Sequence, residues 1–228
     1  MKILMVNGSP KAAVSVSGTI LDTIAGMLGP LAETRRIRAV IARRATETDL
    51  EADVVVVAFP LYIDSLPAPF LEWLISYHEL VGARGTRAPA KVYAICNCGF
   101  YEGAQTGLAL AVVRNFTCSS GLMWGGGLGI GSGGMLIGLA SVPSEASIKR
   151  PVSRGLAWMA GLVAKAEVSG EVRLVQFAFP RFAYIFMAHA GWRQMARTHG
   201  LRPGDIGRRR GRSGMHHHGQ TTWQDSRD

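Results

Sequence analysis

A chain of 228 residues is long enough for one well-packed domain with an appendage. Hydrophobic residues make up 48% of the chain and charged residues 18%, a composition that excludes disorder throughout. The formal net charge of +9 would suit nucleic acid, an anionic membrane or phosphorylated small molecules, so charge alone does not identify the partner.

The three cysteines are Cys96, Cys98 and Cys118. Their odd number and their spacing exclude a disulfide scaffold, a zinc site of the C-x-x-C type and a four-cysteine iron-sulfur cluster. We therefore expect no metal and a reducing, cytoplasmic location. The first seven residues show no secretory signal, which favours the same location.

The first half of the chain alternates strand and helix patterns. Lys2–Val6 predicts a short strand and Gly18–Leu28 a helix with apolar residues at helical spacing. Glu33–Ile41 carries three arginines and predicts an exposed edge strand. Asp53–Phe59 is rich in valine and predicts a strand buried on both faces. Leu66–Leu80 begins with prolines, which suit a first helical turn.

The alternation continues to about residue 170. Lys91–Asn97 predicts a fourth strand, Gly103–Phe116 a helix, Gly121–Gly129 a fifth strand and Ser147–Ala166 a further helix. A hydropathy window would also flag residues 122–142 as a membrane span, but eight glycines there argue for a strand and a loop. The pattern predicts an α/β protein with a parallel sheet and functional loops at the carboxyl ends of its strands.

The C-terminal part breaks this rhythm. Residues 171–201 combine an apolar run, Pro180 and an amphipathic stretch, and they predict a helical extension of the domain formed by residues 1–170. Residues 202–228 mix glycine, arginine and histidine and predict a disordered basic tail, in which His216–His218 is tail composition rather than a metal site. Because the extension's apolar stripe is too large to leave in water, we expect it to pack across the domain or between subunits, and we predict a homodimer.

The loop after the first strand has the features of a phosphate site. Gly8 and Pro10 shape the turn, hydroxyls follow, Lys11 adds charge, and Gly18 lets the backbone approach closely at a helix N-terminus. The hydroxyls belong to Ser9, Ser15, Ser17 and Thr19. An ordinary capped helix would show the same residues. The P-loop order G-x-x-x-x-G-K-[ST] is absent from this loop.

Two further loops point to a flat aromatic ligand. Residues 60–67 (PLYIDSLP) offer a stacking aromatic and exposed apolar groups on a proline-restricted backbone. Residues 97–103 (NCGFYEG) place two aromatics beside groups that allow close backbone approach. Taken alone, Leu61 and Tyr62 would equally cover the top of the sheet. Three adjacent loops at the carboxyl edge of one sheet favour a common site.

These motifs carry a resemblance that covers about residues 1–170. Through G-S-P-K with S-x-S-G-T, P-L-Y-I-D-S-L-P and N-C-G-F-Y-E, the chain resembles the flavodoxin-like NAD(P)H-dependent FMN reductases and quinone reductases. The resemblance implies a flavodoxin-like five-stranded parallel sheet in the order 2-1-3-4-5 with helices on both faces. It also implies FMN as cofactor and NADH or NADPH as co-substrate.

The same resemblance implies a set of cofactor-binding residues. Those expected to hold the FMN phosphate are Ser9, Lys11, Ser15, Ser17, Gly18 and Thr19. Those expected to border the isoalloxazine are Pro60, Leu61, Tyr62, Ile63, Asn97, Cys98, Gly99, Phe100 and Tyr101. No catalytic side chain is assigned, because the flavin would carry out the chemistry. Tyr101 and Glu102 could orient an acceptor and Cys98 could contact the flavin, yet packing roles account for them equally.

Several alternatives stay open. Residues 129–134 match G-x-G-x-x-G by letters but follow the last strand, so a loop near the flavin or dimer edge is favoured over a second nucleotide site. Arg35, Arg36 and Arg38 lack interleaved aromatics and indicate a solvated face rather than nucleic-acid binding. The favoured function is reduction of a quinone, flavin or similar acceptor. A flavodoxin-type electron carrier and a flavin-free interaction protein are the rivals.

Overall fold

The structure is a computed structural model that describes residues 1–84, 89–202 and 204. The chain divides into two compact units, Met1–Pro180 and Arg181–Asp228. Apart from Arg202 and Gly204, the expected disordered tail lies outside the described residues, and so does His216–His218.

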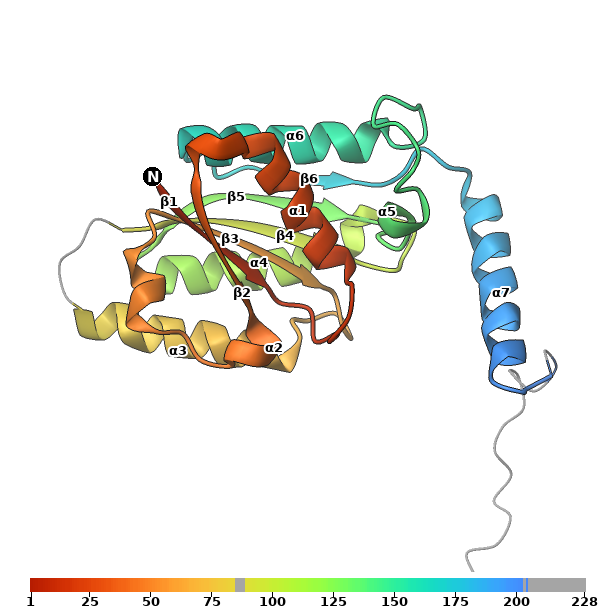
Figure 1. Cartoon of the computed structure of the whole chain (residues 1–228), viewed down its shortest axis with the longest axis horizontal. Helices are drawn as coiled ribbons and strands as arrows, with labels where there is room; N and C mark the ends of the chain where they lie inside the picture. Colours follow the sequence, from red (N-terminus) through yellow and green to blue (C-terminus); the bar gives the residue numbers. More distant parts are fainter. Residues whose placement is uncertain (85–88, 203, 205–228) are drawn as a thin grey trace, which may run out of the picture. The chain divides into compact units, whose positions relative to one another are not determined.

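The first unit is built on a six-stranded parallel sheet (Figure 1). Its strand order is β2-β1-β3-β4-β5-β6, so the expected order 2-1-3-4-5 holds for the first five strands. The strands are β1 (Lys2–Asn7), β2 (Glu33–Arg38), β3 (Val54–Pro60), β4 (Lys91–Asn97), β5 (Met123–Ile130) and β6 (Val172–Val175).

The sixth strand corrects the sequence-based prediction. We expected five strands, a domain ending at residue 170 and helix beyond it. Instead, β6 pairs in parallel with residues Gly127–Ile130 of β5, and the first unit continues to Pro180. The strand is four residues long, sits at the sheet edge and is mostly exposed. It therefore lacks the buried valine run by which an inner parallel strand is recognised.

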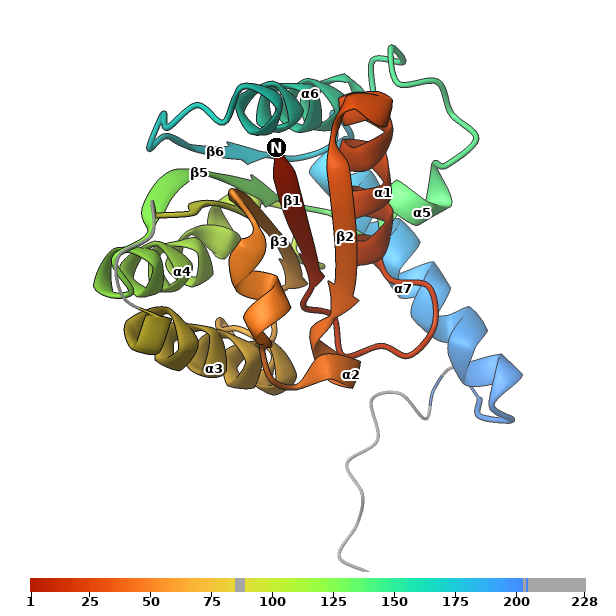
Figure 2. The same cartoon turned by 60° about the vertical axis from the view of Figure 1, so that its left-hand side comes forward.

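Helices cover both faces of the sheet, with α1 and α6 on one side and α3 and α4 on the other (Figure 2). The long helices are α1 (Val16–Leu28), α3 (Ala68–Arg84), α4 (Gly107–Ser119) and α6 (Arg150–Lys165). Shorter ones are α2 (Ala39–Ala42), α5 (Met135–Gly138) and the 3-10 turns η1 (Gly29–Leu31), η2 (Glu47–Glu51) and η3 (Gly103–Thr106). The expected helix over residues 103–116 is thus a 3-10 turn followed by α4.

The period-2 alternation of the central strands divides the core into two layers. On β1, Leu4 and Val6 pack into the layer beneath α3 and α4, whereas Ile3 and Met5 pack into the layer beneath α1 and α6. Strand β3 is buried on both faces from Val54 to Phe59, as its valine run predicts. Strand β2 lies at the sheet edge, as expected, and its Arg35 and Arg36 are exposed.

Gly125 of β5 makes room for the ring of Tyr93. A Cβ atom on Gly125 would lie 2.4 Å from Cε1 of the Tyr93 ring. The phenol hydroxyl of Tyr93 donates to the backbone oxygen of Glu167 at 2.8 Å. This segment is the buried strand expected in place of a membrane span. Within the described residues, no helix has the length and apolar character to cross a bilayer.

The described part of the second unit consists mainly of one helix, α7 (Arg181–Thr198). The sequence analysis expected helix over residues 171–201, and α7 occupies residues 181–198 of that range. A T-shaped contact at 5.7 Å between the rings of His189 and Trp192 lies within α7.

Candidate functional site

The carboxyl ends of the inner strands bring the three predicted loops to one edge of the sheet. Asn7, at the end of β1, pairs with Ala58 of β3. Pro60, at the end of β3, pairs with Asn97 of β4, which in turn pairs with Ile130 of β5. The loops that follow these residues therefore start side by side, as the parallel pattern predicts.

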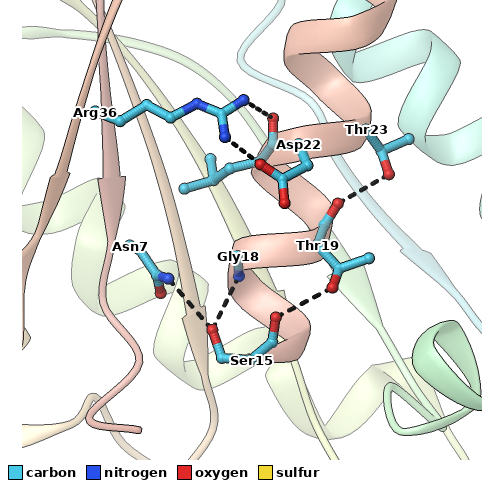
Figure 3. A network of polar contacts seen from close by, with 8 residues as sticks. Asn7, Ser15, Gly18, Thr19, Asp22, Thr23 and Arg36 are labelled. Atoms are coloured by element: carbon cyan, nitrogen blue, oxygen red, sulfur yellow. Dashed lines mark hydrogen bonds and ion pairs between the residues drawn. The ribbon is translucent and has the colours of Figure 1, made fainter. Parts of the chain in front are cut away.

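Ser15 organises the N-terminus of α1 (Figure 3). Its Oγ accepts hydrogen bonds from the backbone N–H of Gly18 at 3.1 Å and from Nδ2 of Asn7 at 3.2 Å. A hydroxyl has two acceptor positions and one proton, so Ser15 still has its proton to donate. Val16 and Ser17 occupy the first helical positions, where N–H groups have no acceptor within the helix. This end of α1 is suited to an oxyanion.

The side chain of Ser17 is engaged within the protein. Its hydroxyl donates to Oδ1 of Asn97 at 2.9 Å, and both side chains are buried. Because its only proton is used in this bond, the side chain has no donor left for an anion. The hydrogen bond instead ties the start of α1 to the end of β4. Because 80 residues separate Ser17 from Asn97 in the sequence, no local motif predicts this hydrogen bond.

The loop between β1 and α1 is held by its own polar groups and by β2. The backbone N–H of Ser9 donates to Oδ1 of Asn7 at 3.0 Å, and that of Lys11 donates to Oγ of Ser9 at 3.3 Å. From the end of β2, Nη2 of Arg38 donates to the carbonyls of Lys11 and Ala12 at 2.6 and 2.8 Å. Lys11 itself is exposed. One cation, Lys11, thus belongs to this loop, and a second, Arg38, is bonded to its backbone.

Arg38 contacts the candidate anion loop, whereas the sequence analysis assigned it to a solvated face. Its neighbours Arg35 and Arg36 also have partners: Arg35 contacts buried Asp49 at 2.6 Å, and Arg36 forms an ion pair with Asp22 on α1 (Figure 3). The position of Arg38 at the end of its predicted strand is the sequence feature that could have indicated this contact. In the parallel pairing, Arg38 lies opposite Asn7, so it ends its strand beside the phosphate loop.

The remaining predicted phosphate residues are placed as follows. A Cβ atom on Gly18 would lie 3.2 Å from both Ser15 Oγ and Asn7 Nδ2. Glycine at this position therefore avoids crowding the hydrogen bonds of Ser15, which caps α1. At Gly8, a Cβ would lie 2.8 Å from Phe59 and Phe70. Thr19 uses its hydroxyl on the carbonyl of Ser15 at 3.3 Å. These residues shape the loop rather than offer donors.

The loop after β3 forms a tight, strained hairpin. Tyr62 and Ser65 exchange two backbone hydrogen bonds of 3.0 Å, and Ile63 and Asp64 between them both have positive φ, 49° and 56°. This two-residue turn normally takes asparagine, aspartate or glycine, so a β-branched residue at its first position is strained. Ile63 is 100% exposed and Tyr62 is 42% exposed. The strained turn therefore exposes apolar side chains next to the loop between β1 and α1, and backbone strain of this kind is frequent at ligand sites.

The loop after β4 combines an exposed ring with engaged polar groups. Phe100 is 54% exposed, whereas Tyr101 donates its hydroxyl to the carbonyl of Phe179 at 2.5 Å. Cys98 is buried, and burial raises the pKa of its thiol, so the group is protonated at neutral pH. Its Sγ lies 3.6 Å from the carbonyl of Glu102.

Leu61 is buried at the start of the neighbouring loop, and its N–H donates to the carbonyl of Asn97 at 2.8 Å.

The glycine-rich segment after β5 packs against this same loop. A Cβ atom on Gly131 would lie 2.4 Å from the carbonyl oxygen of Tyr101, and one on Gly133 would lie 3.2 Å from Cβ of Asn97. Ser132, with φ 55°, donates its N–H to Phe100 and its hydroxyl to Tyr101. Gly131 of the G-x-G-x-x-G match and the intervening Gly133 therefore allow close backbone packing in a buried connection, whereas Gly134, the last glycine of the match, is exposed and has open space where a Cβ atom would lie.

Comparison with solved structures identifies the fold. An NADH:FMN oxidoreductase in its apo form superimposes with a TM-score of 0.53 at 18% identity, over 74% of this chain and 90% of that one. An NADPH-quinone reductase from P. pentosaceus gives 0.51 at 14% identity, over 72% and 98%. Oxidised flavodoxin 1 from Bacillus cereus gives 0.51 at 16% identity, over 72% and 97%. The chain has the flavodoxin-like fold that these proteins share.

No protein-family model and no curated protein sequence matches the chain. Among the described residues, no group of three or more histidine, cysteine, aspartate or glutamate side chains is placed to hold a metal ion.

Proposed function

We propose that this protein is an FMN-dependent oxidoreductase that takes hydride from NADH or NADPH and reduces a quinone, a flavin or a similar acceptor. The observation that carries the proposal is the juxtaposition at one sheet edge of an anion site on α1 with two loops that expose Tyr62, Ile63 and Phe100. An anion site beside exposed apolar rings fits a ligand with a phosphate and a flat heteroaromatic system.

The residues present fit FMN. In this proposal, the N–H groups of Val16 and Ser17 and the hydroxyl of Ser15 donate to the phosphate, and Lys11 and Arg38 supply positive charge. The hairpin at Tyr62 and the Phe100 loop border the isoalloxazine ring. Bound FMN supplies hydride acceptance and electron transfer, and the protein supplies position and electrostatics.

The protein's own side chains act by holding the ligand rather than by transferring protons. The Cys98 thiol is buried with a raised pKa, and the Tyr101 hydroxyl is bonded to a backbone carbonyl. The Tyr101 hydroxyl thus already has its proton in a hydrogen bond within the protein. The buried bond between Ser17 and Asn97 fixes the anion site relative to the end of β4, where the ring-binding loop begins.

The test is a binding and turnover measurement on the full chain. FMN is expected to bind at least about a hundred-fold more tightly than riboflavin, because riboflavin lacks the phosphate and forfeits its charge-assisted hydrogen bonds. The FMN-loaded protein is expected to oxidise NADH or NADPH in the presence of a quinone. Equal affinity for the two flavins would reject the anion site, and failure to oxidise either nucleotide would reject the reductase.

A flavodoxin-type electron carrier is the second candidate, favoured by the equal TM-scores of the flavodoxin and the quinone reductase. The net charge of +9 opposes it, because flavodoxins usually present acidic surfaces. A carrier would bind FMN and cycle with a chemical reductant, yet leave both nicotinamide nucleotides unoxidised. The turnover experiment therefore separates the two functions.

A further inference from the structure

Helix α7 exposes an unusual amount of apolar surface. Phe182 is 77% exposed, Phe186 71% and Trp192 58%. Ile185, Met187 and Met195 on the same helix are also exposed. Soluble proteins seldom leave such a concentration of large apolar side chains in water, so this helix is built to contact something apolar.

The charge on this helix has one sign. From Val172 to Gly204 the sequence contains no aspartate or glutamate, whereas α7 itself carries Arg181, Arg193 and Arg197. Further along the sequence, an arginine cluster follows at residues 208–212. A helix with large exposed apolar side chains and only positive charges is complementary to a surface that is apolar inside and negatively charged at its boundary with water.

We infer that α7 binds the surface of an anionic lipid bilayer, lying in the headgroup region with its apolar side chains among the acyl chains. Its uncharged stretch, residues 182–192, extends about 16 Å along the helix. The hydrocarbon core is about 30 Å thick, so the stretch is suited to interfacial binding rather than to spanning. Trp192 and Tyr184 belong to the residue types that prefer the membrane interface.

The arginines favour lipid over a second copy of the chain. The sequence analysis expected a homodimer through this region, which would bring two cationic helices together. Neither copy of α7 has a carboxylate to pair with Arg193 or Arg197 of the other. Anionic headgroups satisfy these guanidinium groups, whose long stems also allow the charges to remain at the lipid surface.

The experiment measures binding of the full chain to large unilamellar vesicles by co-sedimentation. Vesicles of phosphatidylcholine with about 30% phosphatidylglycerol are compared with pure phosphatidylcholine at about 0.1 M salt, where exposed charges are only partly screened. Binding is expected with the anionic vesicles, with at least a ten-fold weaker partition to the neutral ones. Binding is independent of flavin, so the result does not depend on the proposed reductase function.

Substitutions on α7 locate the contact. Arg193→Gln and Arg197→Gln are each expected to lower the partition coefficient about five-fold. Phe186→Ser is expected to lower it about ten-fold through loss of buried apolar area. The matched controls lie on other helices, Arg114→Gln on α4 and Ile75→Ser on α3, where the wild-type side chains are also exposed. Both controls are expected to change the partition less than two-fold.

Three outcomes would overturn the inference. Equal losses for Arg193→Gln and Arg114→Gln would show that overall charge, not α7, attracts the vesicles. No binding to anionic vesicles would remove lipid as the occupant. A dimer in analytical ultracentrifugation that Phe186→Ser converts to monomer would show that a second copy covers the helix. Circular dichroism of each variant checks that it is folded.

Discussion

The hydroxyl of Ser17 on α1 donates a hydrogen bond to Oδ1 of Asn97 at the end of β4, across 2.9 Å and buried from solvent. This bond joins the candidate anion site to the strand that leads into the ring-binding loop. Asn7 and Ser15 make the corresponding connection from β1. The anion site is therefore positioned from two central strands.

Replacing Ser17 with alanine leaves a buried carbonyl oxygen on Asn97 without this donor. The free energy of unfolding is expected to fall by about 1–3 kcal/mol, measured by urea denaturation. The control is Ser119→Ala on α4, where the hydroxyl bonds to the exposed backbone of its own helix. It is expected to change stability by about 0.5 kcal/mol or less. Equal effects of the two substitutions would mean that the Ser17 bond contributes nothing specific.

Arg38 is expected to matter for FMN more than for riboflavin. Arg38→Met removes the guanidinium that holds the carbonyls of Lys11 and Ala12, together with a charge near the anion site. The Kd for FMN is expected to rise about ten-fold, measured by flavin fluorescence quenching, with a smaller change for riboflavin. Arg154→Met on α6 provides the matched loss of an exposed arginine. A riboflavin Kd that rises as much as the FMN Kd would contradict a role at the phosphate.

The hairpin at Ile63 is expected to tolerate a better turn residue. Asparagine adopts positive φ readily, so Ile63→Asn should raise the free energy of unfolding by about 1 kcal/mol. The same change at Ile75, an exposed position within α3, should lower the free energy of unfolding by about 0.3 kcal/mol, because asparagine is a poorer helix former. Denaturation of both variants tests the difference in sign. If Ile63→Asn also weakens turnover, the strain serves ligand contact.

Tyr93 makes stability depend on pH in the alkaline range. Burial raises the pKa of its phenol from 10.0 to about 12, with a smaller contribution from Glu167. The folded state holds the proton more tightly than the unfolded chain, so this stabilisation is complete below pH 10 and is lost between pH 10 and 12. The stability difference between wild type and Tyr93→Phe should shrink by about 2–3 kcal/mol across that window. A difference that is constant with pH would mean an ordinary phenol pKa.

Local patterns predicted the inner part of this fold well. The valine run of β3 and the apolar run of β4 mark strands buried on both faces, and the glycine-rich segment was predicted as a strand that proved to be β5. The edge strand β6 was missed because four mostly exposed residues form a strand only through pairing with β5. Its identity depends on tertiary structure, which no local periodicity records.

The sequence predicted where the three loops of the candidate site meet, but not the contacts that their side chains make. Loops at the carboxyl ends of parallel strands could be located from strand order alone. The partners of Ser17 and Arg38 could not, because each lies on another element of the sequence. Which hydroxyls remain available to a ligand is decided by those partners. The composition of a loop therefore marks a candidate site but does not assign the roles of its individual side chains.

The parallel pairing of β1, β3 and β4 also has a kinetic consequence. The ends of these strands, Asn7, Pro60 and Asn97, meet only after two long crossover connections have closed. Contacts between residues so distant in sequence form late and slow the folding of parallel sheets. A partly folded chain would lack the site altogether, so a ligand bound there should delay unfolding of the native chain without hastening its formation.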